Sequence, residues 1–295
     1  MSDTARWIKW KTGGGPRVRG GVAFAPPAPW DPWTKVLGVI ARCEGHHDTV
    51  VMYDGTGVTA GFLQWTFTSG RLQRLLESFK AIPSSDGHPQ VSLFDEACRA
   101  GGDPAAPQLF EAFGFRIEGG RFVAARDGRA LDPSLPAQKK RIVDLCLGAG
   151  SGAPMKTALA LADLFAALGS RPAVATAQIQ FAKGELAREL AYARRPLSGR
   201  TIRALLGADD GAAWEAPLVA LFMNLWQNNP GAAYKLFLKA AGDGGPDAMF
   251  DRAWKLTNRS RFGRWGWPNE PKSPRCLRIA EAVEEFFGQY LPLFK

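Results

Sequence analysis

Hydrophobic residues recur at helical spacing through most of the chain after residue 30. Asp31-Pro32 supplies an N-cap residue and a proline for the first helical position, and an apolar face follows until Gly45. Shorter helices are expected from Ser69 and over Leu93–Arg99. Beyond residue 136 the spacing predicts a nearly continuous series of helices. These helices cover residues 137–148, 154–168, 172–193, 198–206, 214–227, 230–241, 246–256 and 274–288.

Strand patterns are confined to short segments. Phe113–Ile117 and Arg121–Ala125, joined by Glu118-Gly119-Gly120, predict a small β-hairpin. Residues 1–30 are rich in Gly and Pro without periodicity, so we expect an extended arm there. No shift in composition divides residues 31–295, which we expect to form a single domain. The expected fold is therefore mainly α (α+β) with one or two small β-hairpins.

Two carboxylates lie close together in the sequence around the end of the first predicted helix. Glu44 falls in its last turn, where the negative end of the helix dipole and apolar neighbours both disfavour a charged carboxylate. A general acid must carry a proton at neutral pH, so this position suits that role, whereas a solvated Glu at a helix end is the alternative. Asp54 opens a run with glycines at 55, 57 and 61, which can bend tightly beside a ligand or form an ordinary turn. One acid and one base flanking a Gly-rich turn suit glycoside hydrolysis.

The run Asp54-Gly55-Thr56-Gly57-Val58-Thr59-Ala60-Gly61 is similar to the Asp-Gly-x-Gly-Tyr-Thr-Ala-Gly run of chitosanase-type glycoside hydrolases. The order of Glu44 and then Gly61-Phe62-Leu63-Gln64 resembles the lysozyme-like superfamily, whose members carry a Gly-x-x-Gln element after the catalytic Glu. The resemblance covers roughly residues 33–80. Val58 replaces the family's aromatic residue, and the interval from Glu to Asp is shorter than in chitosanases.

This resemblance implies a lysozyme-like, two-lobed helical domain. It implies that Glu44 is the general acid, that Asp54 is the general base for water, and that Thr59 helps to hold that water. The shorter interval leaves the separation of the two carboxylates open, and with it the stereochemical outcome.

Aromatic and amide residues near these positions are candidates for sugar binding. Tyr53 and Trp65 flank the Gly-rich run and are expected to stack on sugar rings, with Gln64 beside them. His47 is expected at the rim of the cleft, in contact with substrate. Amides at the end of the apolar helix Leu218–Trp226 suit sugar hydroxyls, although capping of the helix end is the alternative. These amides are Asn224, Gln227 and Asn228.

Neither a metal nor a cofactor is expected. Glu44-Gly45-His46-His47-Asp48 contains ligand-type residues, but adjacent histidines in a turn rarely reach one ion, so we predict no metal site. The four cysteines are far apart and lack metal-type spacing, which predicts free thiols.

The net charge of the chain narrows the class of polymer that it is expected to bind. The 295 residues include 37 Lys and Arg against 28 Asp and Glu, a net charge of +9 that favours a polyanionic partner. Basic residues are scattered and form no nucleic-acid motif, which argues against a nucleic acid. Bacterial cell wall is also polyanionic, whereas chitosan is a polycation that this chain would repel.

No apolar core of a secretory signal occurs in Met1–Lys11, and no apolar run approaches the roughly 20 residues of a membrane span. We therefore expect synthesis in the cytoplasm without a signal peptide, no membrane span, and non-classical delivery to the cell wall by a delivery apparatus or phage particle. The leading interpretation is a peptidoglycan-cleaving glycoside hydrolase of muramidase type, whose partner is the polysaccharide substrate. The alternatives are a chitosanase, a lytic transglycosylase that needs only Glu44, and a non-enzymatic wall-binding or structural module.

Overall fold

The computed structural model describes residues 6–8, 17–19, 21–26, 28–52, 56–84, 92–98, 109–149, 151–191, 206, 216–243, 245–259 and 274–289. It is mainly helical with small antiparallel sheets, which confirms the predicted α+β class. The chain divides into two compact units, which we describe separately. Unit 1 comprises Met1–Phe24 and Gly45–Phe181, and unit 2 comprises Ala25–Glu44 and Ala182–Lys295.

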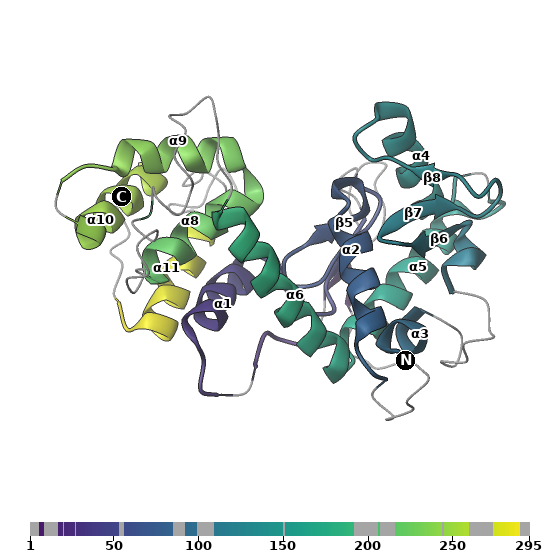
Figure 1. The fold of residues 1–295 in the computed structure, drawn as a ribbon, viewed down its shortest axis with the longest axis horizontal. Coiled ribbons are helices and arrows are strands. Elements are labelled where there is room, and N and C mark those ends of the chain that lie inside the picture. The colour runs from purple at the N-terminus through teal and green to yellow at the C-terminus, as the bar shows by residue number, and fades with distance from the viewer. Residues whose placement is uncertain are drawn as a thin grey trace. The chain divides into compact units, whose positions relative to one another are not determined.

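Unit 2 is built around α1 (Pro32–Glu44), which packs against α8 (Ala216–Asn228) and α11 (Pro274–Phe287) (Figure 1). The side chain of Asp31 accepts a hydrogen bond of 2.7 Å from the Thr34 N–H, so the predicted N-cap is present. Gly38 permits close packing on α11, since a Cβ at this position would lie 2.8 Å from the Phe286 ring. Glu44 ends α1, as the sequence predicted.

The remaining helices of unit 2 cover α8. Every residue from Leu218 to Trp226 is buried, as expected for a helix that is apolar on all sides. α9 (Pro230–Ala240) packs on it, with the Phe222 and Phe237 rings 4.8 Å apart, and α10 (Gly245–Arg259) follows. The Ala182–Leu190 half of α6 (Pro172–Leu190) also belongs to this unit, where Glu189 accepts a 2.6 Å hydrogen bond from the indole N–H of Trp226.

Unit 1 contains a five-stranded antiparallel sheet whose strands lie in sequence order. They are β1 (Arg6–Ile8), β2 (Arg17–Arg19), β3 (Val50–Val51), β4 (Thr59–Ala60) and β5 (Trp65–Thr66). The sequence predicted only an extended arm before residue 31, whereas β1 and β2 add to the sheet at the edge of β3. Strands of three residues are too short to show an alternating pattern, which is why periodicity did not predict them.

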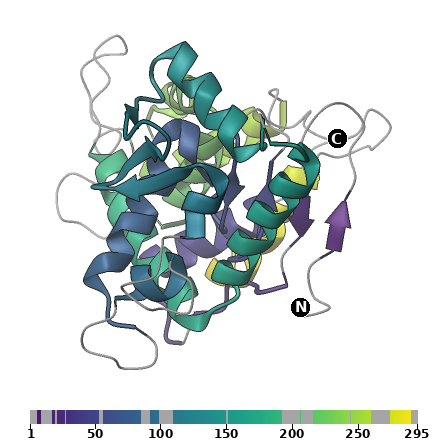
Figure 2. The same ribbon diagram turned by 90° about the vertical axis from the view of Figure 1, so that its right-hand side faces the viewer.

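A second, three-stranded sheet is formed by β6 (Phe115–Glu118), β7 (Arg121–Ala124) and β8 (Ala130–Leu131) (Figures 1 and 2). It confirms the predicted hairpin and adds the unpredicted strand β8. Aromatic rings fill the core beneath it and meet edge to face or stacked. They are Phe67, Phe110, Phe115, Phe122 and Phe165.

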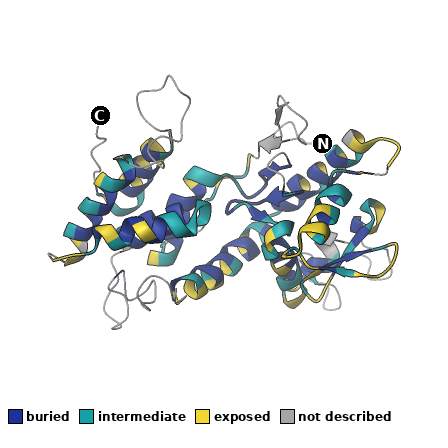
Figure 3. Ribbon diagram, turned by 90° about the horizontal axis from the view of Figure 1, so that it is seen from above, coloured by how far each residue is buried: buried dark blue, intermediate teal, exposed yellow. Residues whose placement is uncertain are grey.

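Short helices complete unit 1, and their ends lie within three residues of the predicted ones. The α-helices are α2 (Arg71–Ser78), α3 (Leu93–Cys98), α4 (Pro136–Cys146) and α5 (Pro154–Gly169), followed by the Pro172–Phe181 half of α6. Single 3₁₀ turns span Phe67–Ser69, Phe79–Ala81 and Leu109–Phe113. Several helices carry buried and exposed residues on opposite sides, dark blue and yellow in Figure 3, as amphipathic helices do. Of the predicted helix 198–206, only Leu206 lies within the described residues.

Membrane-spanning character is weak in the described residues. None of their helices is by itself long and apolar enough to cross a membrane. Lys156–Gly169 and Pro172–Leu190 meet the length and composition test only as a pair, bent by 85°.

The end of α5 packs so closely on the loop after α1 that only glycine fits there. A Cβ on Gly169 would lie 2.3 Å from the His47 carbonyl oxygen and 2.6 Å from the Asp48 Cα. We expect Gly169→Ala to lower the free energy of unfolding by about 3 kcal/mol in urea titrations, because backbone atoms cannot move aside as a side chain can. Gly184→Ala is the control, since no atom lies within 4 Å of its added Cβ and alanine favours the helix. Equal stabilities of the two variants would contradict this packing.

Candidate active site

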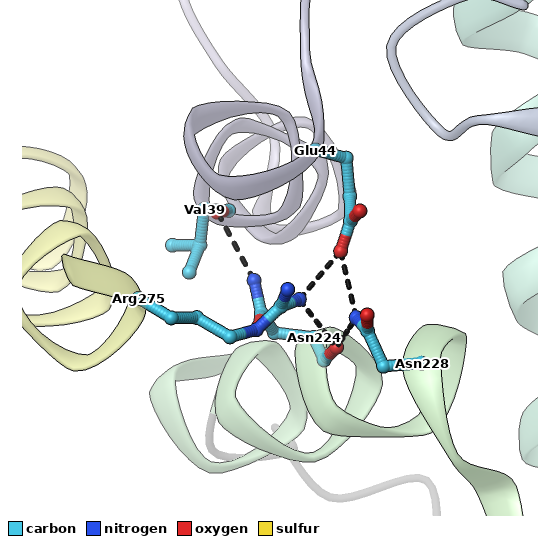
Figure 4. Close-up of polar contacts among 5 residues, drawn as sticks. All are labelled: Val39, Glu44, Asn224, Asn228 and Arg275. Atoms are coloured by element: carbon cyan, nitrogen blue, oxygen red, sulfur yellow. Dashed lines mark hydrogen bonds and ion pairs between the residues drawn. The ribbon is translucent and has the colours of Figure 1, made fainter. Parts of the chain in front are cut away.

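Glu44 is held by one of its two carboxyl oxygens. Its Oε1 accepts a 2.7 Å hydrogen bond from Asn228 Nδ2 and a 2.5 Å contact from Arg275 Nη2 (Figure 4). The Glu44 side chain is 15% exposed. Within the described part of the chain, both hydrogen bonds to the Glu44 carboxyl group go to Oε1, and none goes to Oε2.

Arg275 is itself fixed by Asn224. The Asn224 Oδ1 accepts from Arg275 Nε at 3.1 Å and Nη2 at 2.8 Å, and its backbone carbonyl accepts from Nη2 at 3.2 Å. The Asn224 amide donates in turn to the Val39 carbonyl at 3.4 Å (Figure 4). Helices α1, α8 and α11 therefore each contribute to one network that orients the guanidinium toward Glu44.

The predicted amides take different places in this network. Asn224 is completely buried and holds Arg275, so it presents nothing to a sugar in this structure. Asn228 is half-buried and binds Glu44 directly, while Gln227 is half-buried beside it at the end of α8. Sequence reasoning missed Arg275. The available signal was an arginine in the first turn of a helix, where the dipole disfavours a cation unless a nearby anion compensates.

The Gly-rich run belongs to unit 1 and leads into β4. Thr59, on β4, is only 3% exposed, and its Oγ1 lies 2.7 Å from the Thr56 Oγ1. Gly57 has φ +83°, and a Cβ there would meet the Cys146 thiol of α4 at 3.2 Å. The predicted general base Asp54 and the aromatic residue Tyr53 lie outside the described residues.

The Gly-x-x-Gln element forms a tight turn between β4 and β5. Gln64 has φ +54°, which is uncommon for a residue other than glycine. Its backbone N–H and its side-chain amide both donate to the Gly61 carbonyl, at 3.0 and 2.8 Å. Gly61 has φ +77°, and a Cβ there would lie 2.8 Å from the Trp65 ring. The half-buried Gln64 thus closes the turn with its own side chain in a strained conformation, which often marks functional loops.

Trp65 supports this turn from within the core. It has 0% exposure and packs edge-on against Phe62 and Phe181, with centroids 5.3 and 6.0 Å away. Its ring therefore has no face open to a sugar, in contrast to the expected stacking role. Tertiary packing, which the local sequence does not reveal, decides this placement.

His47 is also buried rather than placed at an exposed rim. Its Nδ1 lies 3.1 Å from Gln178 Oε1, while the Gln178 amide donates to the His47 carbonyl at 3.0 Å. Phe24 stacks on the imidazole at 5.8 Å. Because Oε1 can only accept, Nδ1 carries the proton in this bond. Burial lowers the pKa of His47, outweighing the Gln178 bond and the Asp48 charge, which act in the opposite direction.

The described residues contain no group of three or more His, Cys, Asp or Glu side chains that could hold a metal ion. Three of the four cysteines are free thiols, as predicted. They are Cys43, Cys146 and Cys276.

Acid is expected to destabilise the protein through His47. Below pH 6.5, the ordinary pKa, the unfolded chain binds a proton at this residue that the folded protein does not. The free energy of unfolding should therefore decrease as the pH is lowered, by at most about 1.4 kcal/mol for each pH unit. Thermal unfolding between about pH 7.5 and 5 should show a shallower pH slope in His47→Asn than in wild type. Identical slopes in wild type and His47→Asn would contradict the assignment.

Comparisons with known proteins assign no role to these residues. The chain matches no family model, no curated protein and no solved structure. Two groups of residues are candidates for its chemistry: Glu44 with Arg275 in unit 2, and the turn from Thr59 to Gln64 in unit 1.

Proposed function

We propose that the chain is a glycoside hydrolase that cleaves the glycan strands of peptidoglycan. The observation that carries the proposal is the two-sided environment of Glu44. Asn228 and Arg275 hold Oε1, while Oε2 lacks a hydrogen-bond partner in the described residues. A general acid needs this combination, because its position must be fixed while one oxygen carries the proton to the substrate.

Arg275 contributes to the chemistry through its charge. When Glu44 gives its proton to the glycosidic oxygen, a negative charge remains on the carboxylate. The guanidinium, only 11% exposed and already fixed by Asn224, stabilises that charge without reorganising. The interaction strengthens as the proton leaves, so it favours the transition state over the bound substrate.

The Gly-rich run supplies the second half of the reaction. By its resemblance to the chitosanase run, Asp54 takes a proton from water while Thr59 holds that water. The turn that Gly61 and Gln64 close directly after β4 supports the role of Thr59, because it fixes the backbone next to this residue. Gln64, half-buried at the turn, remains a candidate for contact with the glycan.

Charge favours peptidoglycan over chitosan as the substrate. A chain with a net charge of +9 attracts a polymer that carries peptide carboxylates and repels one that carries free amines. Chitosanase and lytic transglycosylase activities use the same Glu44 and remain the alternative chemistries.

Loss of the Glu44 proton donor should remove activity. We expect Glu44→Gln to lower the release of reducing ends from purified sacculi by roughly 10²- to 10⁴-fold in a protein that still folds, because the amide oxygen can still accept from Asn228 and Arg275. Glu285→Gln is the matched control, since it neutralises another ion-paired glutamate of unit 2, whose partner is the exposed Arg42. Wild-type activity in Glu44→Gln would favour a non-enzymatic wall-binding or structural module.

The hydrogen-bond geometry of Arg275, and not only its charge, should contribute to the catalytic rate. Arg275→Lys keeps the charge but cannot contact Asn224 and Glu44 through a planar fork. We expect kcat on sacculi to fall roughly 10- to 100-fold, with little change in KM. Arg42→Lys, which alters an exposed ion pair between α1 and α11, should leave kcat unchanged. If Arg275→Lys keeps the wild-type kcat, the positive charge of residue 275 is sufficient and the hydrogen bonds of the guanidinium do not contribute to the rate.

A further inference from the structure

The side-chain amide of Asn228 is held in one orientation by hydrogen bonds within unit 2. Its Nδ2 donates to Glu44 Oε1 at 2.7 Å and to the Asn224 carbonyl oxygen at 3.2 Å (Figure 4). An amide nitrogen has two hydrogens, so these two bonds use both of them. Exchange of nitrogen and oxygen would place Oδ1 against two acceptors, which fixes the orientation of the amide. Glu44, Asn224 and Asn228 all belong to unit 2.

The accepting end of the Asn228 amide therefore has a fixed place beside the proposed general acid. Within the described residues its Oδ1 receives no hydrogen bond, and Asn228 is half-buried, so part of its side chain contacts solvent. An amide oxygen only accepts hydrogen bonds. A group that binds there while the glycosidic oxygen lies at Glu44 must therefore present an N–H or an O–H.

Both candidate polymers carry a nitrogen donor next to the cleaved bond. In peptidoglycan and in chitosan alike, nitrogen is attached to C2, the carbon beside the anomeric carbon. It is a neutral acetamido N–H in the glycan strands of peptidoglycan and an ammonium group in most sugars of chitosan. Hydrogen bonds at this carbon strengthen in the transition state of glycoside hydrolysis, so a protein acceptor for this donor also assists the reaction.

Arg275 favours the neutral donor over the charged one. Its Nη2 and Asn228 Nδ2 both bind Glu44 Oε1, so the guanidinium lies next to the Asn228 amide. Glu44 is neutral while it carries its proton and then does not neutralise Arg275. An ammonium group at Asn228 Oδ1 would face this positive charge, whereas an acetamido N–H would not.

We propose that Asn228 Oδ1 accepts the acetamido N–H on C2 of the sugar at the cleaved bond, which makes Asn228 a specificity-determining residue for N-acetylated glycans. This inference rests on the proposed function. Asn228 then has two roles, because its nitrogen holds Glu44 and its oxygen recognises the N-acetyl group. Its two side-chain atoms thereby couple the position of the general acid to the identity of the sugar.

The ratio of activities on sacculi before and after removal of their N-acetyl groups tests the proposal. We expect kcat/KM of wild type for reducing-end release to be at least about 10-fold higher on the N-acetylated sacculi. Asn228→Asp should lower this ratio roughly 10-fold or more, because a carboxylate accepts better from an ammonium group than from an amide. A role of Asn228 in holding Glu44 alone would lower both activities equally and leave the ratio unchanged. Re-acetylation with acetic anhydride should restore the wild-type activity on the treated sacculi.

Asn258→Asp is the matched control. The Asn258 amide donates to the Trp254 carbonyl at 2.9 Å, four residues earlier in α10, as the Asn228 amide does to Asn224 in α8. This variant should keep the wild-type ratio. If Asn228→Asp does not fold, Asn228→Ala replaces it and should lower the ratio about 5-fold through loss of the acceptor.

Two contrary results have different consequences. An unchanged ratio in the folded Asn228 variant, or a wild type without preference for N-acetylated sacculi, would overturn this inference alone. Wild-type protein that releases no reducing ends from either form of sacculi would overturn the proposed function, and this inference with it.

Discussion

The ion pair between Glu44 and Arg275 is the interaction on which the proposed chemistry depends. Glu44 lies at the end of α1 and Arg275 at the start of α11, so each charge lies at the helix end where the dipole disfavours it. The two charges compensate each other once Glu44 has given up its proton, and Asn224 supplies the buried acceptors that hold the guanidinium in place. Burying a charge is costly unless it is both paired and hydrogen-bonded, and this network satisfies both conditions.

In unit 1, side-chain hydrogen bonds to backbone groups fix the loop between α1 and β3. His47 and Gln178 bond to each other through side chain and backbone, directly beneath the turn that Gly61 and Gln64 close. Asp48 accepts hydrogen bonds from the Gly21 and Val22 N–H groups, which attaches the segment after β2 to the same loop. The small residues at Gly61 and Gly169 let these layers approach closely. Close packing therefore surrounds the part of the Gly-rich run from Thr56 to Gly61, which suits residues that must orient a bound water.

The sequence predicts the helices well because their apolar faces repeat over many turns, and Asp31 and Gly45 mark the ends of α1. It also indicates Glu44 and Asn228, each at the end of an apolar helix. Arg275 lies 231 residues from Glu44, and its place in the first turn of a helix does not identify its partner, so only the fold reveals the pair. Trp65 and His47 are residue types that also occur at protein surfaces, so their sequence positions do not show that they are buried. Their burial depends on contacts with Phe62 and Gln178, which are formed only in the folded structure. Strands β1 and β2 are too short to carry a readable period.

Hydrolysis of a glycosidic bond in the bacterial wall is the activity proposed for this chain. Mass spectrometry of the fragments released from purified sacculi in ¹⁸O-labelled water tests it most directly, since hydrolysis places one solvent oxygen at each new reducing end. We predict soluble muropeptides with a single ¹⁸O at the reducing end. Unlabelled fragments with anhydro ends would replace hydrolysis by transglycosylation, and intact sacculi alongside cleaved chitosan would contradict the assignment to peptidoglycan.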